Sequence, residues 1–414
     1  MDRRDFLKCA GAAATIGALA ANTAYAQENT KMNVPERNRN PYKDVAWSKV
    51  HQIHTTTHGH STNQRMLDAY LKRGFQFLTL SNYYPSAPYC PAKKMTVNYY
   101  RVHHNHPVMV KGKLTDGPFD WNKILEPWID EVDEQYRKSY PFKEGDPLYS
   151  NVPDDILEAP NAEHHSFPGS NGNLHLCAPG SSLATGTFDA RNYYKSHSHG
   201  YHFGSGQPWR TAVDRIIEKL IYPDGGGITI NHPAWTKLEY KLMLDILDYD
   251  PRVLGIEVYN QGSATATPEI IWSEPWWDHA LSTGRQCFGF FVPDWGYTKG
   301  VNILLAKEKT VHECLKAYRE GRWYGAIIGC GKLVFNQVNF DGNTLTAATD
   351  KPAKFQVVTK QGISLETTGL SMSFNIPEQD KQKLGYARIK AYATDGSEEI
   401  LFSQPFMLTP APKA

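Results

Sequence analysis

Histidine is the residue type whose spacing says most about chemistry in this chain. The sequence has 16 histidines, and many of them fall in four short clusters. The clusters are HQIHTTTHGH at 51–60, AEHHSFPGSNGNLHL at 162–176, KSHSHGYH at 195–202 and NHP at 231–233. Imidazole and carboxylate groups together suit Zn²⁺, Mn²⁺ or iron. We therefore expect one or two divalent ions, which would lower the pKa of a water ligand and polarise a substrate oxygen.

Alternating strand and helix patterns are the elements that would position these clusters. We expect strands at 48–54, 75–81, 227–231, 254–260 and 286–292, with helices at 63–73, 209–221, 241–247 and 276–283. The last four of these strands are each followed at once by polar or metal-binding residue types. Repeated strand–helix units predict an α/β fold, either a parallel barrel or a doubly wound sheet. Active residues would then lie at the C-terminal ends of the strands.

Two further regions depart from this rhythm. Residues 85–160 are rich in Trp, Tyr and charge, and we interpret them as an insertion over the mouth of the barrel, partly helical near 121–137. After a helix at 311–320, segments that alternate apolar and polar residues predict a small antiparallel β-sandwich. The predicted domains are therefore a barrel domain at 46–330 and a C-terminal domain at 331–414.

The N-terminus has the pattern of a targeting signal. Arg3 and Arg4 precede an apolar stretch of small residues, and Ala24-Tyr25-Ala26 forms an A-x-A cleavage signal. We interpret residues 1–26 as a twin-arginine (Tat) signal peptide and 27–45 as an extended lead-in. The expected protein is periplasmic or secreted, without a membrane anchor.

Composition narrows the class of partner. The net charge is +1 and the pI is about 7.7, so nothing favours nucleic acid. Aromatic residues make up 12% of the chain, including ten Trp, which favours a cleft for a small organic molecule or a saccharide.

Several short motifs occur in a specific order. They are the histidines at 54, 58 and 60, LDAYLKRGFQFLTLSNYY, Glu163, NLHLCAPGS, NHP, GIEVYN and VPDWG. This order, over residues 45–408, resembles the PHP (polymerase and histidinol phosphatase) family of metal-dependent phosphoesterases, nearest its exported, carbaryl-hydrolase-like branch. The resemblance implies a distorted TIM-like (β/α) barrel with a metal-dependent hydrolase site.

The resemblance also implies a set of metal ligands. His54 matches the second histidine of the opening H-x-H pair, and the third ligand best matches His60, with His58 as the near alternative. His197 or His199 would complete the set, because a His-x-His on a strand points both rings the same way. The full set of candidate ligands is His54, His60, Glu163, His175, His197, His199, His232 and Asp294.

This chain departs from the family pattern at three positions. Gln52, Tyr83 and Gly296 stand where the family has histidines. The joint loss of the last two implies that one ion of the family's three-metal arrangement is missing.

Other residues near the predicted site have expected roles that are not metal ligation. His164 is a candidate general acid, or a residue that supports a ligand. Asn82 and Tyr83 stand at a strand end, where they would hydrogen-bond substrate or fill the space of the lost ion. Glu257 is expected to support the barrel end.

The sequence thus predicts an exported metal-dependent hydrolase in which activated water attacks a phosphoester, or another ester or carbamate-like bond. Two alternatives stay open. One is a catalytically inactive glycan-binding protein that keeps the barrel. The other is a single-metal lyase that acts on an acidic sugar, with Tyr83 or His164 as the base.

Overall fold

A computed structural model gives the fold. It describes residues 36–61, 63–81, 91–95, 146–164, 167, 174–183, 208–262, 267–295, 299–327 and 332–410, together with the backbone of Met109–Val110 and Lys113–Leu114. Residues Arg37–Ala414 form one compact unit, separate from Met1–Glu36. The predicted signal peptide and most of the predicted insertion, apart mainly from 91–95 and 146–160, lie outside the described residues. None of the described helices is long and apolar enough to cross a membrane.

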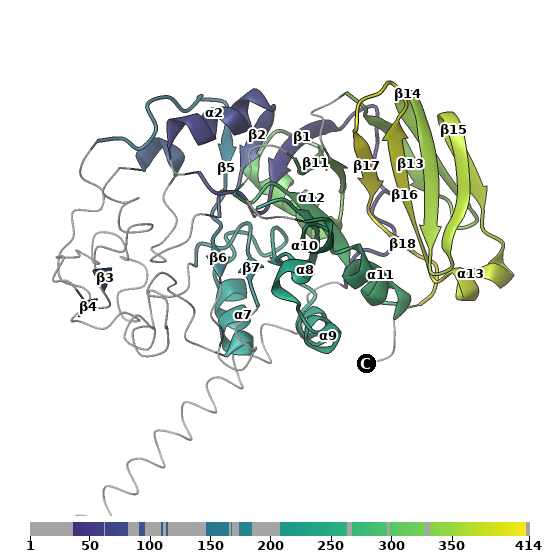
Figure 1. Ribbon diagram of the computed structural model, residues 1–414, viewed down its shortest axis with the longest axis horizontal. Helices are drawn as coiled ribbons and strands as arrows, with labels where there is room; N and C mark the ends of the chain where they lie inside the picture. Colours follow the sequence, from purple (N-terminus) through teal and green to yellow (C-terminus); the bar gives the residue numbers. More distant parts are fainter. Residues whose placement is uncertain are drawn as a thin grey trace, which may run out of the picture. The chain divides into compact units, whose positions relative to one another are not determined.

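The larger of two sheets has eleven strands. Its order is β13-β14-β16-β17-β12-β11-β1-β2-β5, with β15 paired to β14 and β18 paired to β16. The strands are β1 (His51–Thr56), β2 (Phe75–Leu78), β5 (Leu157–Glu158), β11 (Val301–Ala306), β12 (Trp323–Ile327), β13 (Phe335–Phe340), β14 (Thr344–Thr359), β15 (Gly362–Asn375), β16 (Tyr386–Ala393), β17 (Ile400–Ser403) and β18 (Phe406–Met407). The long strands β14–β16 stand together on one side of the molecule (Figure 1).

The smaller sheet has five strands in the order β10-β9-β8-β7-β6. They are β6 (Glu163–His164), β7 (Leu176–Cys177), β8 (Ile228–Ile230), β9 (Val253–Asn260) and β10 (Phe288–Val292). β8, β9 and β10 are parallel, whereas β6, β7 and β8 are antiparallel. A separate pair consists of β3 (Met109–Val110) and β4 (Lys113–Leu114).

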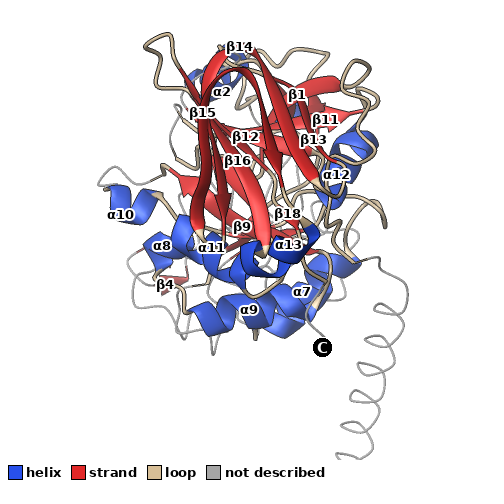
Figure 2. Ribbon diagram, turned by 90° about the vertical axis from the view of Figure 1, so that its right-hand side faces the viewer, coloured by secondary structure: helices blue, strands red, loops and turns tan. Residues whose placement is uncertain are grey.

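The described helices are α2 (Gln64–Lys72), α7 (Trp209–Glu218), α8 (Pro233–Thr236), α9 (Tyr240–Tyr249), α10 (Pro268–Ile271), α11 (Glu274–Ser282), α12 (Val311–Glu320) and α13 (Glu378–Leu384), with a 3₁₀ turn, η1, at Ala92–Lys94. Five of them, α2, α7, α9, α11 and α12, lie where the sequence predicts helices, whereas α8, α10 and α13 were not predicted. α7 packs on β8, while α9 and α11 pack on β9. In Figure 2 these three helices lie below the long strands β14–β16.

Local capping explains two of the helix boundaries. The side chain of Asn63 accepts a hydrogen bond of 3.1 Å from the Met66 N–H, so α2 begins immediately after it. α12 ends at Gly321, whose φ of +77° is a left-handed conformation that glycine adopts without strain. The predicted helices at 63–73 and 311–320 are confirmed to within a residue at each end.

The two sheets enclose an apolar cluster between them. Both contribute to it, through Ile53, Phe77, Leu254 and Phe290, and α12 adds its buried face, including Tyr318. Burial of this face is the main stabilising contribution of the helix, since helix propensity alone is weak.

The architecture is mixed α/β, but two expectations about its layers need correction. Within the described residues neither sheet closes into a barrel, because each has two free edges in its strand order. The C-terminal strands do not form a sheet of their own, since β17 pairs with β12 and so continues the sheet that contains β1 and β2. The pairing is also not wholly parallel, because β11 runs antiparallel to β1.

At one end of the molecule, however, single backbone hydrogen bonds connect the two sheets. The Ser81 N–H donates to the Gly59 carbonyl over 2.9 Å, and the Glu163 N–H donates to the Ser81 carbonyl over 3.2 Å. Gly59 also forms an isolated parallel bridge with Asp294. The segments that follow β1, β2 and β10 are thereby tied to β6, and the candidate ligands His60, Asp294 and Glu163 come from this region.

Candidate metal centre

The centre begins with two histidines just after β1. His58 and His60 are fully buried, and their Nε2 atoms lie 3.1 Å apart. The single residue between them brings both rings to the same side of the chain. The Tyr70 hydroxyl, which comes from α2, donates to the His60 carbonyl over 3.2 Å and fixes the loop on the helix.

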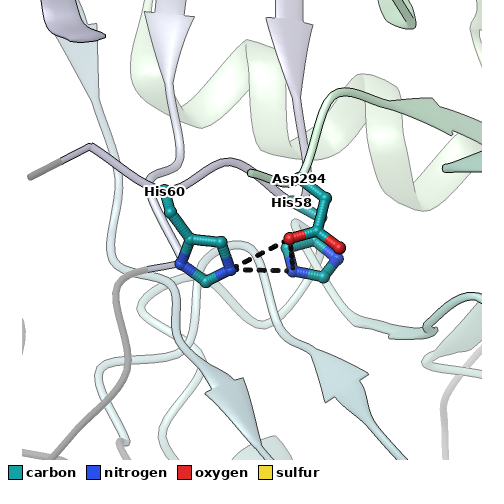
Figure 3. Close-up of side chains that lie close together, drawn as sticks. All are labelled: His58, His60 and Asp294. Carbon is teal, nitrogen blue, oxygen red and sulfur yellow. Dashed lines mark hydrogen bonds and ion pairs between the residues drawn. The ribbon is translucent and has the colours of Figure 1, made fainter. Parts of the chain in front are cut away.

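Asp294, which follows β10, completes this group. Its N–H donates to the His58 carbonyl over 3.1 Å, and its carbonyl accepts from the His60 N–H over 3.2 Å. Its carboxylate Oδ1 lies 3.2 Å from His58 Nε2 and 3.3 Å from His60 Nε2. Figure 3 shows the three side chains pointing at one another from two separate segments.

Glu163 in β6 extends the cluster in two directions. Its Oε2 lies 3.3 Å from the Nε2 atoms of both His58 and His60. Its Oε1 lies 2.9 Å from His175 Nδ1 and 3.3 Å from His232 Nε2. We call His58, His60, Asp294 and Glu163 Oε2 the inner subsite, and Glu163 Oε1, His175 and His232 the outer subsite. One carboxylate therefore joins the two.

Backbone strain is concentrated at this centre. His232 has a φ of +29° and Asp294 a φ of +51°, and the one other non-glycine residue with positive φ in the described part of the chain is Lys237. Such conformations cost roughly 1–3 kcal/mol each and persist where the surrounding structure requires them. These backbone conformations direct the side chains of His232 and Asp294 into the cluster.

Glu257 in β9 orients the inner subsite. Its Oε1 accepts a hydrogen bond of 2.8 Å from His58 Nδ1, and its Oε2 accepts from the His232 N–H and from Asn260 Nδ2, each over 2.8 Å. Because a carboxylate oxygen only accepts, Glu257 holds the Nδ1 proton of His58. In the neutral ring the lone pair is therefore on Nε2 and is directed at the cluster, where it can bind a metal ion or a proton.

Three carboxylates in this region, Glu163, Glu257 and Asp294, are buried. Among the described residues their hydrogen bonds and ion pairs go to histidine, asparagine and backbone N–H groups, and none goes to lysine or arginine. A buried carboxylate without a compensating positive charge is strongly unfavourable. The lone pair of His58 also faces two carboxylate oxygens. The donor set therefore fits a cation, and three-residue groups that could hold a metal include His58, His60 and Asp294, and His58, Glu163 and His232.

The pKa values respond to the same excess of negative charge. Burial opposes charging of the His58 ring, but the attraction of Asp294, Glu257 and Glu163 raises its pKa well above the usual value. Burial also opposes ionisation of Asp294, yet the charge of His58 and the hydrogen bond from His60 lower its pKa to about 2. The centre thus favours a positive charge at the point where these groups meet.

The structure brings together five of the residues that the sequence analysis singled out as ligands. These are His60, Glu163, His175, His232 and Asp294. His197, His199, Asn82 and Tyr83 lie outside the described residues, as does Gly296.

His54 lies apart from these five. It is within β1, opposite Ile303, and its Nδ1 would be 3.4 Å from a Cβ at Gly74. It precedes His58 by four residues, which in an extended strand is about 13 Å. His54 is absent from the three-residue groups of converging ligand atoms in the described structure.

Two other expectations look different in the structure. Gln52 donates to the Phe335 carbonyl over 3.1 Å and accepts from the Tyr324 hydroxyl, so it connects β1 to β12 and β13. His164 follows Glu163 in β6 and so faces the opposite side of the strand. Burial lowers the pKa of His164 to about 3, which keeps the ring neutral.

Sequence reasoning underrated His58 and missed Asn161. His58 contacts Glu163, Glu257, Asp294 and His60, and HGH at 58–60 is itself an H-x-H motif, so the signal was present. Asn161 is buried and binds three backbone segments: Nδ2 donates to the carbonyls of Thr57 and Thr79, and Oδ1 accepts from the Ala178 N–H, each over 2.8 Å. No local pattern marks such a residue.

Comparisons with known proteins include a distant similarity to a solved structure. No family model matches the sequence, and no curated protein matches it. A similar solved structure is a two-domain protein from Bacteroides vulgatus that contains a predicted PHP-like metal-dependent phosphoesterase. It is 13% identical, the TM-score is 0.36, and the match covers 90% of this chain and 100% of that chain.

Proposed function

We propose that this protein is a metal-dependent hydrolase of the PHP-like type, which cleaves a phosphoester or another ester or carbamate-like bond. The observation that carries the proposal is the convergence of His58, His60, Asp294 and Glu163 on one point, with His175 and His232 on the other oxygen of Glu163. Two ions bridged by one carboxylate fit this arrangement better than a single ion.

The side chains would divide the work between two ions. The inner subsite would hold one, with His58 fixed in the correct tautomer by Glu257. The outer subsite would hold the other, and it is the more open of the two, because the His175 side chain is 20% exposed. Ions held there lower the pKa of a water ligand and polarise the bond to be cleaved.

Charge supports an anionic or strongly polar substrate group. The three buried carboxylates Glu163, Glu257 and Asp294 contribute three negative charges, which two divalent ions would outweigh. A phosphoryl or carbonyl oxygen would complete the coordination. Hydrolysis then adds water across the ester bond and releases an alcohol and an acid.

We also propose the finer features that the sequence suggested. The segments following β1, β2 and β10 are tied to β6 by backbone hydrogen bonds, which supports a distorted, open barrel-like arrangement in which the two sheets meet at the site. Export through the twin-arginine signal would deliver a folded protein that already contains its metal.

Elemental analysis of the purified protein tests the proposal directly. After expression with added Zn²⁺ or Mn²⁺, we expect about two equivalents of metal per chain. Glu163→Ala should remove both ions and abolish hydrolysis of p-nitrophenyl phosphate and p-nitrophenyl acetate, because it deletes the shared ligand.

A matched pair of histidine variants tests the assignment of the ligands. His58→Ala should lower the metal content. His54→Ala should leave it unchanged, because His54 lies within β1, four residues before His58. Less than about half an equivalent of metal in the wild-type protein would contradict the proposal and favour the inactive, glycan-binding alternative. Unchanged metal content and activity in Glu163→Ala would contradict it as well.

A further inference from the structure

Two tryptophans at the metal centre are unusually exposed. Trp235 is 48% exposed and Trp295 is 39% exposed. In the part of the chain that the structure describes, the other tryptophans are buried or partly buried; they are Trp47, Trp209, Trp272, Trp276, Trp277 and Trp323. An exposed indole leaves a large apolar surface in water, and this surface gains free energy when a ligand covers it.

Both rings contact ligand histidines, and they do so at different subsites. Trp295 directly follows Asp294 and stacks on His60 of the inner subsite, with ring centroids 4.6 Å apart and an interplanar angle of 22°. Trp235, from α8, packs edge-on against the outer subsite, with centroids 4.9 Å from His232 and 5.7 Å from His175. Each subsite therefore has an exposed indole beside it.

Substrate held at the metal centre would come next to both indoles. An indole binds ring-shaped groups well, through offset or edge-to-face contact with an aromatic ring or through the C–H face of a sugar ring. Each aromatic contact of this kind contributes about 0.5–1.5 kcal/mol beyond area burial. A linear alkyl group would cover less of either ring.

We propose that Trp235 and Trp295 form a ring-binding subsite, and that the substrate carries a ring, aryl or pyranose, next to the bond that is cleaved. This inference rests on the proposed hydrolase function, because it assumes that the cleaved group is held by the metal centre. It adds a substrate class that the metal ligands alone do not specify.

Calorimetric binding to the metal-loaded protein tests the inference without relying on turnover. The probes are inorganic phosphate, methylphosphonate, phenylphosphonate and glucose 1-phosphate, with hydrolysis of the last checked by phosphate release. We expect phenylphosphonate or glucose 1-phosphate to bind about tenfold more tightly than methylphosphonate. A gain with phenylphosphonate alone assigns an aryl substrate, and a gain with the sugar phosphate alone assigns a pyranose.

Variants connect this gain to the two indoles. Trp235→Ala and Trp295→Ala should each weaken binding of the ring-bearing probe by about three- to tenfold, with methylphosphonate binding and metal content unchanged. Trp295→Phe should retain most of the affinity for the ring-bearing probe that Trp295→Ala loses. Tyr240→Ala is the matched control, because Tyr240 is 41% exposed but stacks on His279, away from the ligands.

The outcomes separate this inference from the hydrolase proposal. If phosphate binds in a metal-dependent way but the ring gives no gain, the ring-binding subsite is wrong and the hydrolase proposal stands. Equal weakening of all probes in the tryptophan variants also overturns the subsite, because it shows damage to the metal centre. If none of the probes binds in a metal-dependent way, the phosphoesterase form of the hydrolase proposal fails, and the ring-binding subsite next to a phosphoryl group fails with it.

Discussion

His58 is the residue on which the inner subsite depends most. It is fully buried, and its two ring nitrogens have different partners, Glu257 on Nδ1 and the cluster on Nε2. A histidine ligand needs one ring nitrogen held so that the other presents its lone pair. Glu257 provides this by accepting the Nδ1 proton.

Replacement of Glu257 tests this positioning role. Glu257→Ala should lower metal affinity by about 10- to 100-fold, because His58 loses the group that fixes its tautomer and orientation. Competition with a chromophoric chelator at pH 7 measures the change. Glu399→Gln is the control. The Glu399 side chain is also buried, but it accepts a hydrogen bond from the Leu333 N–H and contacts none of the ligands that the structure describes. Unchanged metal affinity in Glu257→Ala would rule out the role.

At the scale of elements, the turn after β9 leaves the space that the Asp294 side chain occupies. The Asn260 side chain donates to Glu257 and accepts from the Gly262 N–H over 2.8 Å, so the chain turns tightly at Gly262. A Cβ at Gly262 would lie 2.2 Å from both Cγ and Oδ2 of Asp294. The absence of a side chain at this position is therefore what allows the carboxylate to reach the inner subsite.

Gly262→Ala should accordingly weaken metal binding. Overpacking of this kind costs about 1–3 kcal/mol, and Asp294 can relieve it by turning away from the cluster, so we expect a loss of about tenfold or more in metal affinity. Gly369→Ala in β15 is the matched control, because its nearest contact would be an ordinary 3.5 Å. The same chelator competition applies, and equal metal affinity in the two variants would show that Asp294 does not need the space.

At the scale of the whole molecule, the C-terminal strands are fastened to the helices of the smaller sheet. Arg388 in β16 is 1% exposed and donates to Glu274 and Asp278 of α11 over 2.8 and 2.9 Å. Its guanidinium also lies 4.7 Å from the ring centroid of Trp277. The pKa of Arg388 is raised, because the charges of Asp278 and Glu274 outweigh its burial.

Loss of this connection should destabilise the fold without changing the site. Arg388→Met leaves two carboxylates without their shared partner, and because both are partly exposed we expect a loss of about 2–4 kcal/mol in the free energy of unfolding. Urea titration measures it. Lys354→Met removes an exposed ion pair with Glu366 and should cost less than about 1 kcal/mol. A similar small loss for Arg388→Met would mean that the strands are held by apolar packing instead.

Much of the local structure was predictable, because its causes are local. The helix that follows Asn63 begins where its cap dictates, and α12 ends at Gly321. The strand at 254–260 is an apolar run, apart from Glu257 and the terminal Asn260, and is wholly buried. The joining of the C-terminal strands to β12 was not predictable, because an alternating pattern indicates a half-buried strand but does not identify its neighbour.

The sequence by itself determined the kind of centre, since clusters of histidine and carboxylate at strand ends indicate a metal site wherever they meet. Only the tertiary structure decided which histidines meet. His58 belongs to the inner subsite and His54 does not, because β1 continues to Thr56 before the chain turns into the cluster. The partner that orients His58 is 199 residues away. Spacing along the chain carries no information about such distant contacts, because they depend on how the sheets pair and on where each strand ends.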